Sequence, residues 1–205
     1  MRMNPIIVAA LFGLAAPAAV AAPLVVNGGF EQPGTFTGPF TTIGAGSSYL
    51  SGWNIEMGSV DLIQSYWTAD EACYSLDLSG LSPAKISQTI SGLTAGKRYA
   101  LSFAMAGNRD GGNSVKSLTA SAGGTSGQYV FDTGSVSGPG MGWQDNVLEF
   151  VADSDTVTIS FESNEDNPYG PALDDVGVSP VPLPAAGLLL IGALGGLGLA
   201  RRRKA

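Results

Sequence analysis

The segment Tyr99–Met105, which reads YALSFAM, alternates large apolar side chains with small ones. Its large side chains fall at every second position, and Ala or Ser stands between them. A period of two is typical of a strand with one buried face. The same alternation recurs along the chain, in segments separated by turn-forming Gly, Pro and Asn. The further predicted strands are Leu24–Val26, Val60–Ile63, Tyr74–Leu78, Lys85–Ile90, Val115–Ala120, Gln128–Phe131, Val147–Phe150, Val157–Phe161 and Leu173–Val178.

Strands of this kind bury their apolar faces by stacking into two sheets. No long segment of the body shows the period of an amphipathic helix. The pattern therefore predicts an all-β fold, a two-sheet jelly-roll sandwich. The region Gly34–Ser51 is rich in Gly, Thr and Ser, and we predict that it is a long loop.

The two ends of the 205-residue chain differ from its body. Residues Met1–Ala21 combine a positive start, an apolar run and the sequence Ala19-Val20-Ala21, which is typical of a cleaved secretory signal. Residues 181–200 carry no charge and are long enough for one membrane-spanning helix. The basic cluster Arg201-Arg202-Arg203-Lys204 follows and is expected to stay in the cytoplasm. We therefore predict one jelly-roll domain, residues 22–180, between a signal and a transmembrane tail at 181–205.

Charge and composition exclude several classes of function. All 17 acidic residues but only five of the ten basic residues lie in the body, which gives it a net charge of −12. So acidic a surface does not favour nucleic acid, whose phosphates need Lys and Arg. The chain has no histidine, which excludes a Ser-His-Asp triad and His-ligated metals. The one cysteine, Cys73, cannot form an internal disulfide and is predicted to be a small buried side chain.

The C-terminus has three parts in order: Val181-Pro182-Leu183-Pro184-Ala185, an apolar run and the basic cluster. This order resembles the sorting tail of PEP-CTERM proteins in its VPLPA variant. The resemblance implies export across the inner membrane of a Gram-negative bacterium and recognition by an exosortase, a membrane transpeptidase-like enzyme. It also implies trimming near the motif and transfer to the surface or matrix of cells that make extracellular polysaccharide or biofilm. A plain single-pass anchor is the alternative.

Short sequence motifs give the body a family resemblance as well. It opens with Leu24-Val25-Val26-Asn27-Gly28-Gly29-Phe30-Glu31 and closes with Ala172-Leu173-Asp174-Asp175-Val176. Together these resemble the ends of galactose-binding-like carbohydrate-binding modules. The motifs Ile86-Ser87-Gln88-Thr89-Ile90 and Tyr169-Gly170-Pro171 resemble the choice-of-anchor C family, relatives of a plant cell-wall domain of unknown function. The resemblance implies a fold and a surface location, and it implies no known reaction.

Two acidic residues, Glu31 and Asp174, are candidate metal ligands. The first and last strands of a jelly roll lie close together, so these carboxylates can meet. Oxygen ligands suit Ca²⁺, whereas a chain without His and with one Cys does not suit zinc or copper. In the carbohydrate-binding jelly rolls that the body resembles, the corresponding residues often hold a structural calcium, and Asp77 is a weaker third candidate here. The equally open alternative is that both acids accept hydrogen bonds from backbone amides.

Aromatic residues beside polar ones in loops suggest a carbohydrate site, because sugar rings stack on aromatic faces and their hydroxyls pair with polar groups. Tyr66 and Trp67 precede an acidic loop, and we predict that Trp67 is exposed. Asn108, Arg109 and Asp110 begin a Gly-rich loop, and Tyr169 lies in a Pro/Gly turn expected near it. Each of these residues, taken singly, also has an ordinary structural interpretation. The predicted core aromatics are Trp53, Tyr99 and Trp143.

These features favour an exported, non-catalytic carbohydrate-binding module at the cell surface or in the matrix. The adjacent acids Asp70-Glu71 and Glu165-Asp166 lie in predicted loops, and 17 acids produce glycosidase-like pairs by chance. The expected partners are the exosortase, extracellular polysaccharide and, before processing, the membrane. Two alternatives stay open, a structural or adhesive matrix protein without a small ligand, and a glycan-processing enzyme.

Overall fold

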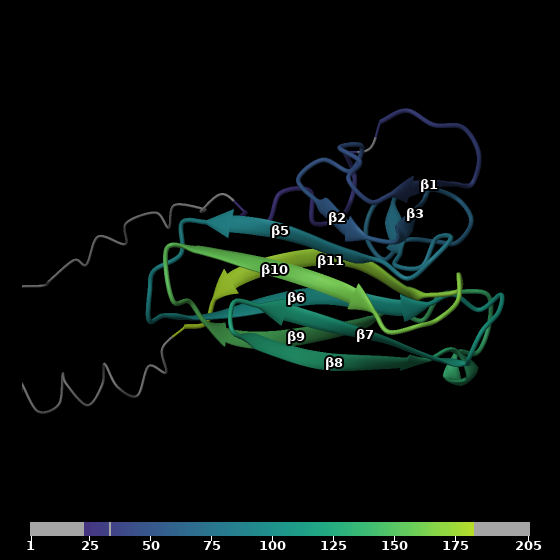
Figure 1. Ribbon diagram of the computed structural model, residues 1–205. Helices are drawn as coiled ribbons and strands as arrows, with labels where there is room; N and C mark the ends of the chain where they lie inside the picture. The colour runs from purple at the N-terminus through teal and green to yellow at the C-terminus, as the bar shows by residue number, and fades with distance from the viewer. Residues whose placement is uncertain (1–22, 33, 183–205) are drawn as a thin grey trace, which may run out of the picture.

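The computed structural model describes residues 23–32 and 34–182, which form strands, loops and one short 3-10 helix, η1 (Thr133–Ser135). The strands are β1 (Phe40–Gly44), β2 (Asn54–Met57), β3 (Ser59–Ile63), β4 (Ser75–Asp77), β5 (Lys85–Ser91), β6 (Arg98–Gly107), β7 (Val115–Ala122), β8 (Thr125–Asp132), β9 (Gln144–Val151), β10 (Thr156–Ser163) and β11 (Pro171–Pro180). One sheet has the order β1-β3-β4-β11-β6-β9 and the other the order β2-β5-β10-β7-β8. Figure 1 shows the two sheets stacked face to face.

The antiparallel pairings are nested about one hairpin. β7 pairs with β8, β6 with β9, β5 with β10, and β4 with β11. These pairs belong alternately to the five-stranded and the six-stranded sheet. A hairpin that is folded over in this way, with successive pairs in opposite sheets, is a jelly roll. The prediction of an all-β, two-sheet jelly-roll sandwich is confirmed.

The core lies between the sheets and follows from the alternation in the sequence. Leu101 and Phe103 in β6 are at most 2% exposed, as is Phe161 in β10. The rings of Phe103 and Phe161 meet edge to face at 5.0 Å, which joins the two sheets through their aromatic side chains. Burial of such apolar surface supplies most of the favourable free energy of folding. Trp53 and Tyr99 are buried as predicted, whereas Trp143 is only partly buried against this core.

Three local predictions are wrong. Leu24–Val26 is not a strand, because the Gln88 side chain takes the place of a strand partner: its amide accepts from Val26 N at 2.7 Å and donates to Val26 O at 2.9 Å. The predicted loop Gly34–Ser51 contains β1, an edge strand that pairs with β3. Cys73 is exposed rather than buried.

Several loops gather at one end of the sandwich. β6, β8 and β10 all run toward this end, where β7, β9 and β11 begin (Figure 1). The β6–β7 loop, the η1–β9 loop and the β10–β11 loop therefore lie near one another. β11 runs from this end to the opposite end, where Pro180 pairs with Tyr99.

The predicted signal at Met1–Ala21 lies outside the described residues, as do Leu183, Pro184, Ala185 and the rest of the predicted tail. Val181 is described, and its N–H donates to the Arg98 carbonyl at 3.0 Å. Within residues 23–32 and 34–182, no helix is long and apolar enough to span a membrane.

Candidate functional site

Five of the six predicted binding residues line one hollow of about 410 Å³, which we call the Asp110 hollow. The β3–β4 loop contributes Tyr66 and Trp67 to it. The β6–β7 loop contributes the consecutive residues Asn108, Arg109 and Asp110. The η1–β9 loop adds Pro139 and Met141, which the sequence did not single out as binding residues. Loops that are distant in sequence thus form one site.

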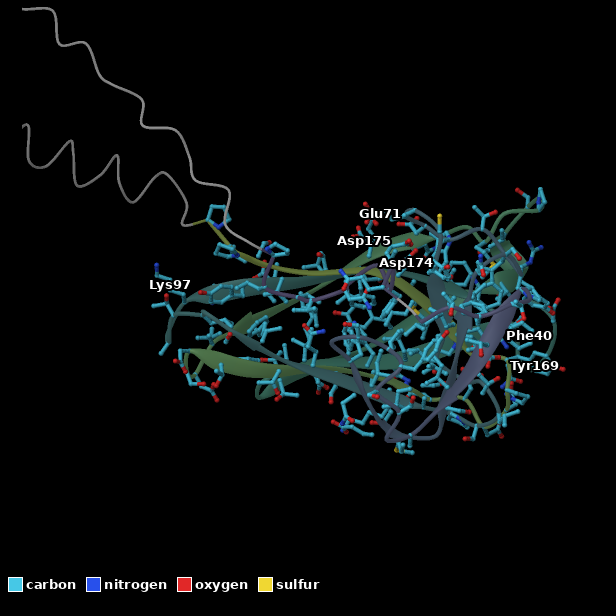
Figure 2. The ribbon with its side chains drawn as sticks, turned by 90° about the horizontal axis from the view of Figure 1, so that it is seen from above. Phe40, Glu71, Lys97, Tyr169, Asp174 and Asp175 are labelled. Carbon is cyan, nitrogen blue, oxygen red and sulfur yellow. The ribbon has the colours of Figure 1, made fainter. Side chains whose placement is uncertain are left out.

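Tyr66 forms the exposed centre of an aromatic row. Its side chain is 47% exposed, and its ring contacts Phe40 at 5.5 Å and Trp67 at 5.7 Å between centroids, both edge to face. Tyr169 does not line the hollow but lies beside it, since its ring packs against Gly111 of the β6–β7 loop. Figure 2 shows Phe40 and Tyr169 at the same end of the molecule.

A second hollow, of about 640 Å³, lies on the other side of the Tyr66–Trp67 pair, and we call it the Cys73 hollow. It shares Tyr66, Trp67 and Pro139 with the Asp110 hollow, so the two hollows adjoin at these residues, and together we call them the groove. Its further lining residues are Gln64, Ser65, Thr68, Ala69, Ala72 and Cys73. Besides the aromatic rings, most of the side chains that line the groove are small or polar.

The polar residues of the Asp110 hollow differ in how many of their hydrogen-bonding groups are already used within the protein. Tyr66 donates its hydroxyl to the Asp110 carboxylate, and this bond is the main reason that the pKa of Tyr66 is raised. Arg109 donates from Nη1 to the Gly138 carbonyl at 2.9 Å and to the Gly140 carbonyl at 3.1 Å. The guanidinium therefore holds the Gly138–Gly140 turn against the groove, and only part of its donor capacity faces solvent.

Two predicted contact residues are more buried than their loop positions suggested. Trp67 is partly buried against the core, and its indole N–H donates to Ser75 Oγ at 2.9 Å. Asn108 is 8% exposed: its Nδ2 donates to Asp77 at 2.8 Å, and its Oδ1 accepts from the Asp110 amide at 3.0 Å. The prediction that Trp67 is exposed is therefore met only in part, since its ring lines both hollows while it also packs on the core. The amide of Asn108 is used mainly for hydrogen bonds within the protein.

Asp77 lies in β4, 1% exposed, and its oxygens accept from Ser79 N, Gly170 N and Asn108 Nδ2. Burial raises the pKa of Asp77 to about 7, and these three donors oppose that rise. With its oxygens occupied by donors of the protein, Asp77 does not fit the role of a third calcium ligand.

Glu31 and Asp174 come together at one loop, as predicted from the fold. Glu31 Oε1 accepts from the amides of Cys73 at 2.7 Å and Tyr74 at 2.8 Å. Asp174 accepts from the amides of Asp70, Glu71 and Asp175 at 2.8–3.1 Å, and burial raises its pKa to about 7. Figure 2 shows Glu71, Asp174 and Asp175 close to one another.

Both carboxylates therefore secure the loop 70–74 through its backbone. Among the described residues, no group of three or more His, Cys, Asp or Glu side chains is arranged to hold a metal. The geometry fits the backbone-amide interpretation, and calcium stays a prediction.

A family model described as a protein of unknown function, DUF642, matches residues 23–179. The chain belongs to this family. Its DUF642 domain is 32% identical over 166 residues to halomucin from Haloquadratum walsbyi. The match covers 76% of this chain, and the chain spans about 2% of the length of halomucin.

Solved structures resemble the DUF642 domain weakly. TmCBM61, in complex with beta-1,4-galactotriose, has a TM-score of 0.49 at 18% identity, over 78% of this chain and 100% of the other. A family 16 carbohydrate-binding module has a TM-score of 0.47 at 14% identity, over 76% and 99%. The CBM22-1 xylan-binding domain from Paenibacillus barcinonensis has a TM-score of 0.45 at 11% identity, over 74% and 100%. These likenesses concern the fold alone.

Four residues belong to the candidate site of the DUF642 domain, or border it, without having been predicted there: Phe40, Cys73, Pro139 and Met141. Gly138-Pro139-Gly140 was visible in the sequence as a turn, but no local pattern shows which loops that turn will meet. Phe40 lies in the Gly- and Thr-rich region predicted to be a loop, where its place beside Tyr66 depends on the pairing of β1 with β3.

Proposed function

We propose that the domain is a non-catalytic module that binds a neutral polysaccharide in the groove formed by the Asp110 and Cys73 hollows. The observation that carries the proposal is the exposed ring of Tyr66, which lies between the two hollows beside the Asp110 carboxylate. A sugar ring can stack its apolar face on such a ring while its hydroxyls pair with carboxylate and hydroxyl groups. A groove open on both sides of the aromatic pair suits a chain longer than one sugar.

Charge and acid placement support a neutral ligand and an absence of catalysis. The body carries a net charge of −12, which repels acidic polysaccharides. Among the described residues that line the two hollows, Asp110 is the single carboxylic acid. Glycoside hydrolysis generally uses two carboxylates that flank the scissile bond. The groove is therefore suited to holding a glycan and is poorly suited to cleaving it.

The first test is retention on insoluble neutral polysaccharides. We expect Tyr66→Ala to abolish retention while changing the free energy of unfolding by less than about 1 kcal/mol, because the side chain is half-exposed. Tyr66→Phe keeps the ring and should retain most of the binding. Leu81→Ala is the matched control, since Leu81 is 81% exposed and lies outside both hollows. Equal retention by Tyr66→Ala and the unmutated protein would reject the groove as the site.

Cys73 gives an independent test of the same groove. Its thiol is exposed and borders the Cys73 hollow, so alkylation with a bulky maleimide should reduce retention. Cys73→Ser, treated in the same way, should bind normally. If no neutral polysaccharide is retained at all, the alternative of a matrix protein without a small ligand gains support.

We further propose that the domain is displayed at the cell surface or in the matrix after exosortase processing. The support is the sequence of the two ends, a signal-like start and the Val181–Ala185 motif with its apolar run and basic cluster. Cell fractionation should reveal a shorter mature form only where the exosortase is present. A surface form that retains the basic C-terminus would contradict the sorting proposal and favour a plain anchor.

A further inference from the structure

Asp77 is buried beneath the groove and joins two of the loops around it. Its Oδ2 accepts from Asn108 Nδ2, at the start of the β6–β7 loop, at 2.8 Å. Its Oδ1 accepts from the amide of Gly170, at the end of the β10–β11 loop, at 3.1 Å. A third bond, from Ser79 N at 2.9 Å, fixes the carboxylate relative to its own strand. One side chain thus holds two segments that are far apart in sequence.

Asn108 transmits this restraint to the groove surface. Its Oδ1 accepts from the Asp110 amide, and the Asp110 carboxylate in turn accepts the Tyr66 hydroxyl. A chain of hydrogen bonds therefore runs from the buried carboxylate to the exposed ring at the centre of the site. Because Asn108 donates with one end of its amide and accepts with the other, the orientation of its side chain is fixed by both neighbours.

The other loop is held by a close approach that only glycine allows. A Cβ at Gly170 would lie 2.4 Å from Asp77 Oδ1 and 2.6 Å from Ser79 Oγ. The neighbouring residue, Tyr169, is the aromatic that packs on Gly111 of the β6–β7 loop. The bond from Gly170 to Asp77 therefore sets the position of Tyr169 against the loop that carries Asp110.

Lys116 secures the same β6–β7 loop from the opposite sheet. It extends from β7 into the interior, is fully buried, and donates from Nζ to the Gly111 carbonyl at 2.7 Å. Asp77 and Lys116 thus bond to opposite ends of the segment 108–111. Burying two ionisable groups costs folding free energy, which apolar side chains would not. Their bonds to this segment are consistent with a role in its placement.

We propose that Asp77 is a positioning residue for glycan binding, which fixes Asn108 and Gly170 so that Asp110 and Tyr66 face one ligand and Tyr169 supports their loop from beside the hollow. The inference rests on the proposed function of the groove. It predicts that the polarity of the Asp77–Asn108 pair matters, because a carboxylate must accept where an amide donates. In Asp77→Asn, the new NH₂ group either faces the NH₂ group of Asn108, where neither can accept, or the side chain turns over and no longer accepts from the Gly170 amide.

The test uses this variant and its reversal. Asp77→Asn should weaken polysaccharide retention by about tenfold, the effect of losing one well-formed hydrogen bond to a charged group. The double variant Asp77→Asn/Asn108→Asp exchanges donor and acceptor. The amide introduced in β4 is then able to donate to the new carboxylate and accept from Gly170, while that carboxylate accepts from Asp110 N. We expect the exchange to restore binding to within about threefold of the original, less than the loss of one hydrogen bond.

Amide hydrogen exchange gives a readout that needs no glycan. The Gly170 and Asp110 amides should exchange faster in Asp77→Asn and regain protection in the double variant. Ile159→Val is the control. Ile159 is fully buried in β10, outside both loops, so this substitution should lower the melting temperature. It should leave the exchange rates of both amides and the polysaccharide retention unchanged.

The outcomes separate the two proposals. If no variant and no unmutated protein binds polysaccharide, the proposed function fails, while exchange at Gly170 and Asp110 still tests the positioning. Unchanged exchange at both amides in Asp77→Asn would overturn the positioning role, as would a folded double variant that regains neither protection nor binding. Should the double variant not fold, the single variant decides, because its amides either lose protection or keep it.

Discussion

Trp67 lies in a loop between two strands, yet its indole packs on the core and donates to Ser75 Oγ. Loop residues are usually exposed, and the sequence around Trp67 gives no sign of the exception. What buries the ring is the antiparallel return of the chain, which places Ser75 at the start of β4 opposite Ile63 at the end of β3. The local sequence shows which residue occupies the loop. Whether its side chain is buried depends on the neighbour that the fold places beside it, here Ser75.

Trp67→Ala should therefore affect both stability and binding. We expect a loss of about 2 kcal/mol in the free energy of unfolding, less than for a fully buried aromatic, because only part of the ring leaves the core. Ser75→Ala is the control that removes the hydrogen bond and keeps the ring. Chemical denaturation of both variants measures the difference. A Trp67→Ala protein as stable as the original would show that the ring contributes nothing to packing.

At the scale of the elements, the sequence predicts the strands whose alternation is complete. β6 and β10 keep a buried residue at every second position for most of their length. β1 and β2 each bury one residue, Ile43 and Ile55, so no periodic signal marks them. The candidate binding residues are predictable because aromatic and polar side chains cluster in loops. The buried acid Asp77 was assigned to the metal site instead, since its partners Asn108 and Gly170 become neighbours only in the folded chain.

The loop 70–74 gives a prediction at this scale. Because Glu31 and Asp174 accept from its backbone amides, Glu31→Gln should lower the melting temperature by a few degrees, with or without calcium. A calcium site predicts a different result. Calcium at about 100 times its Kd would stabilise the unmutated protein by about 2.7 kcal/mol, and Glu31→Gln would abolish that gain.

Thermal unfolding with calcium and with chelator separates the two interpretations. We expect the same melting temperature in both for the unmutated protein. A rise of several degrees with calcium that Glu31→Gln removes would restore the calcium prediction.

At the scale of the whole molecule, buried carboxyl groups and a large negative charge make the stability of the domain depend on pH. Burial raises the pKa of both Asp77 and Asp174 to about 7, well above the 3.8 usual for Asp. Between these two values the folded state binds protons that the unfolded state does not, so stability increases as pH falls. Protonation also reduces the repulsion within a body of charge −12, which acts in the same direction.

The domain should therefore melt several degrees higher at pH 5 than at pH 8. Asp77→Asn should reduce this dependence, because it removes one of the two groups. Adding salt distinguishes the causes, since it screens surface repulsion much more than it affects buried carboxylates. A melting temperature that falls steadily from pH 8 to pH 5 would contradict the prediction.

β11 begins beside Asp77 and the groove loops and ends at Pro180, at the far end of the sandwich (Figure 1). Its ten residues span about 30 Å, so the chain leaves the domain roughly that far from the β6–β7 and β10–β11 loops. Any support to which residues beyond Pro182 are fixed would then meet the blunt end of the domain. If the proposed binding and surface display hold, the sandwich acts as a spacer of about 30 Å between the support and the groove loops. A polymer in solution would then reach the aromatic row before it reaches the support.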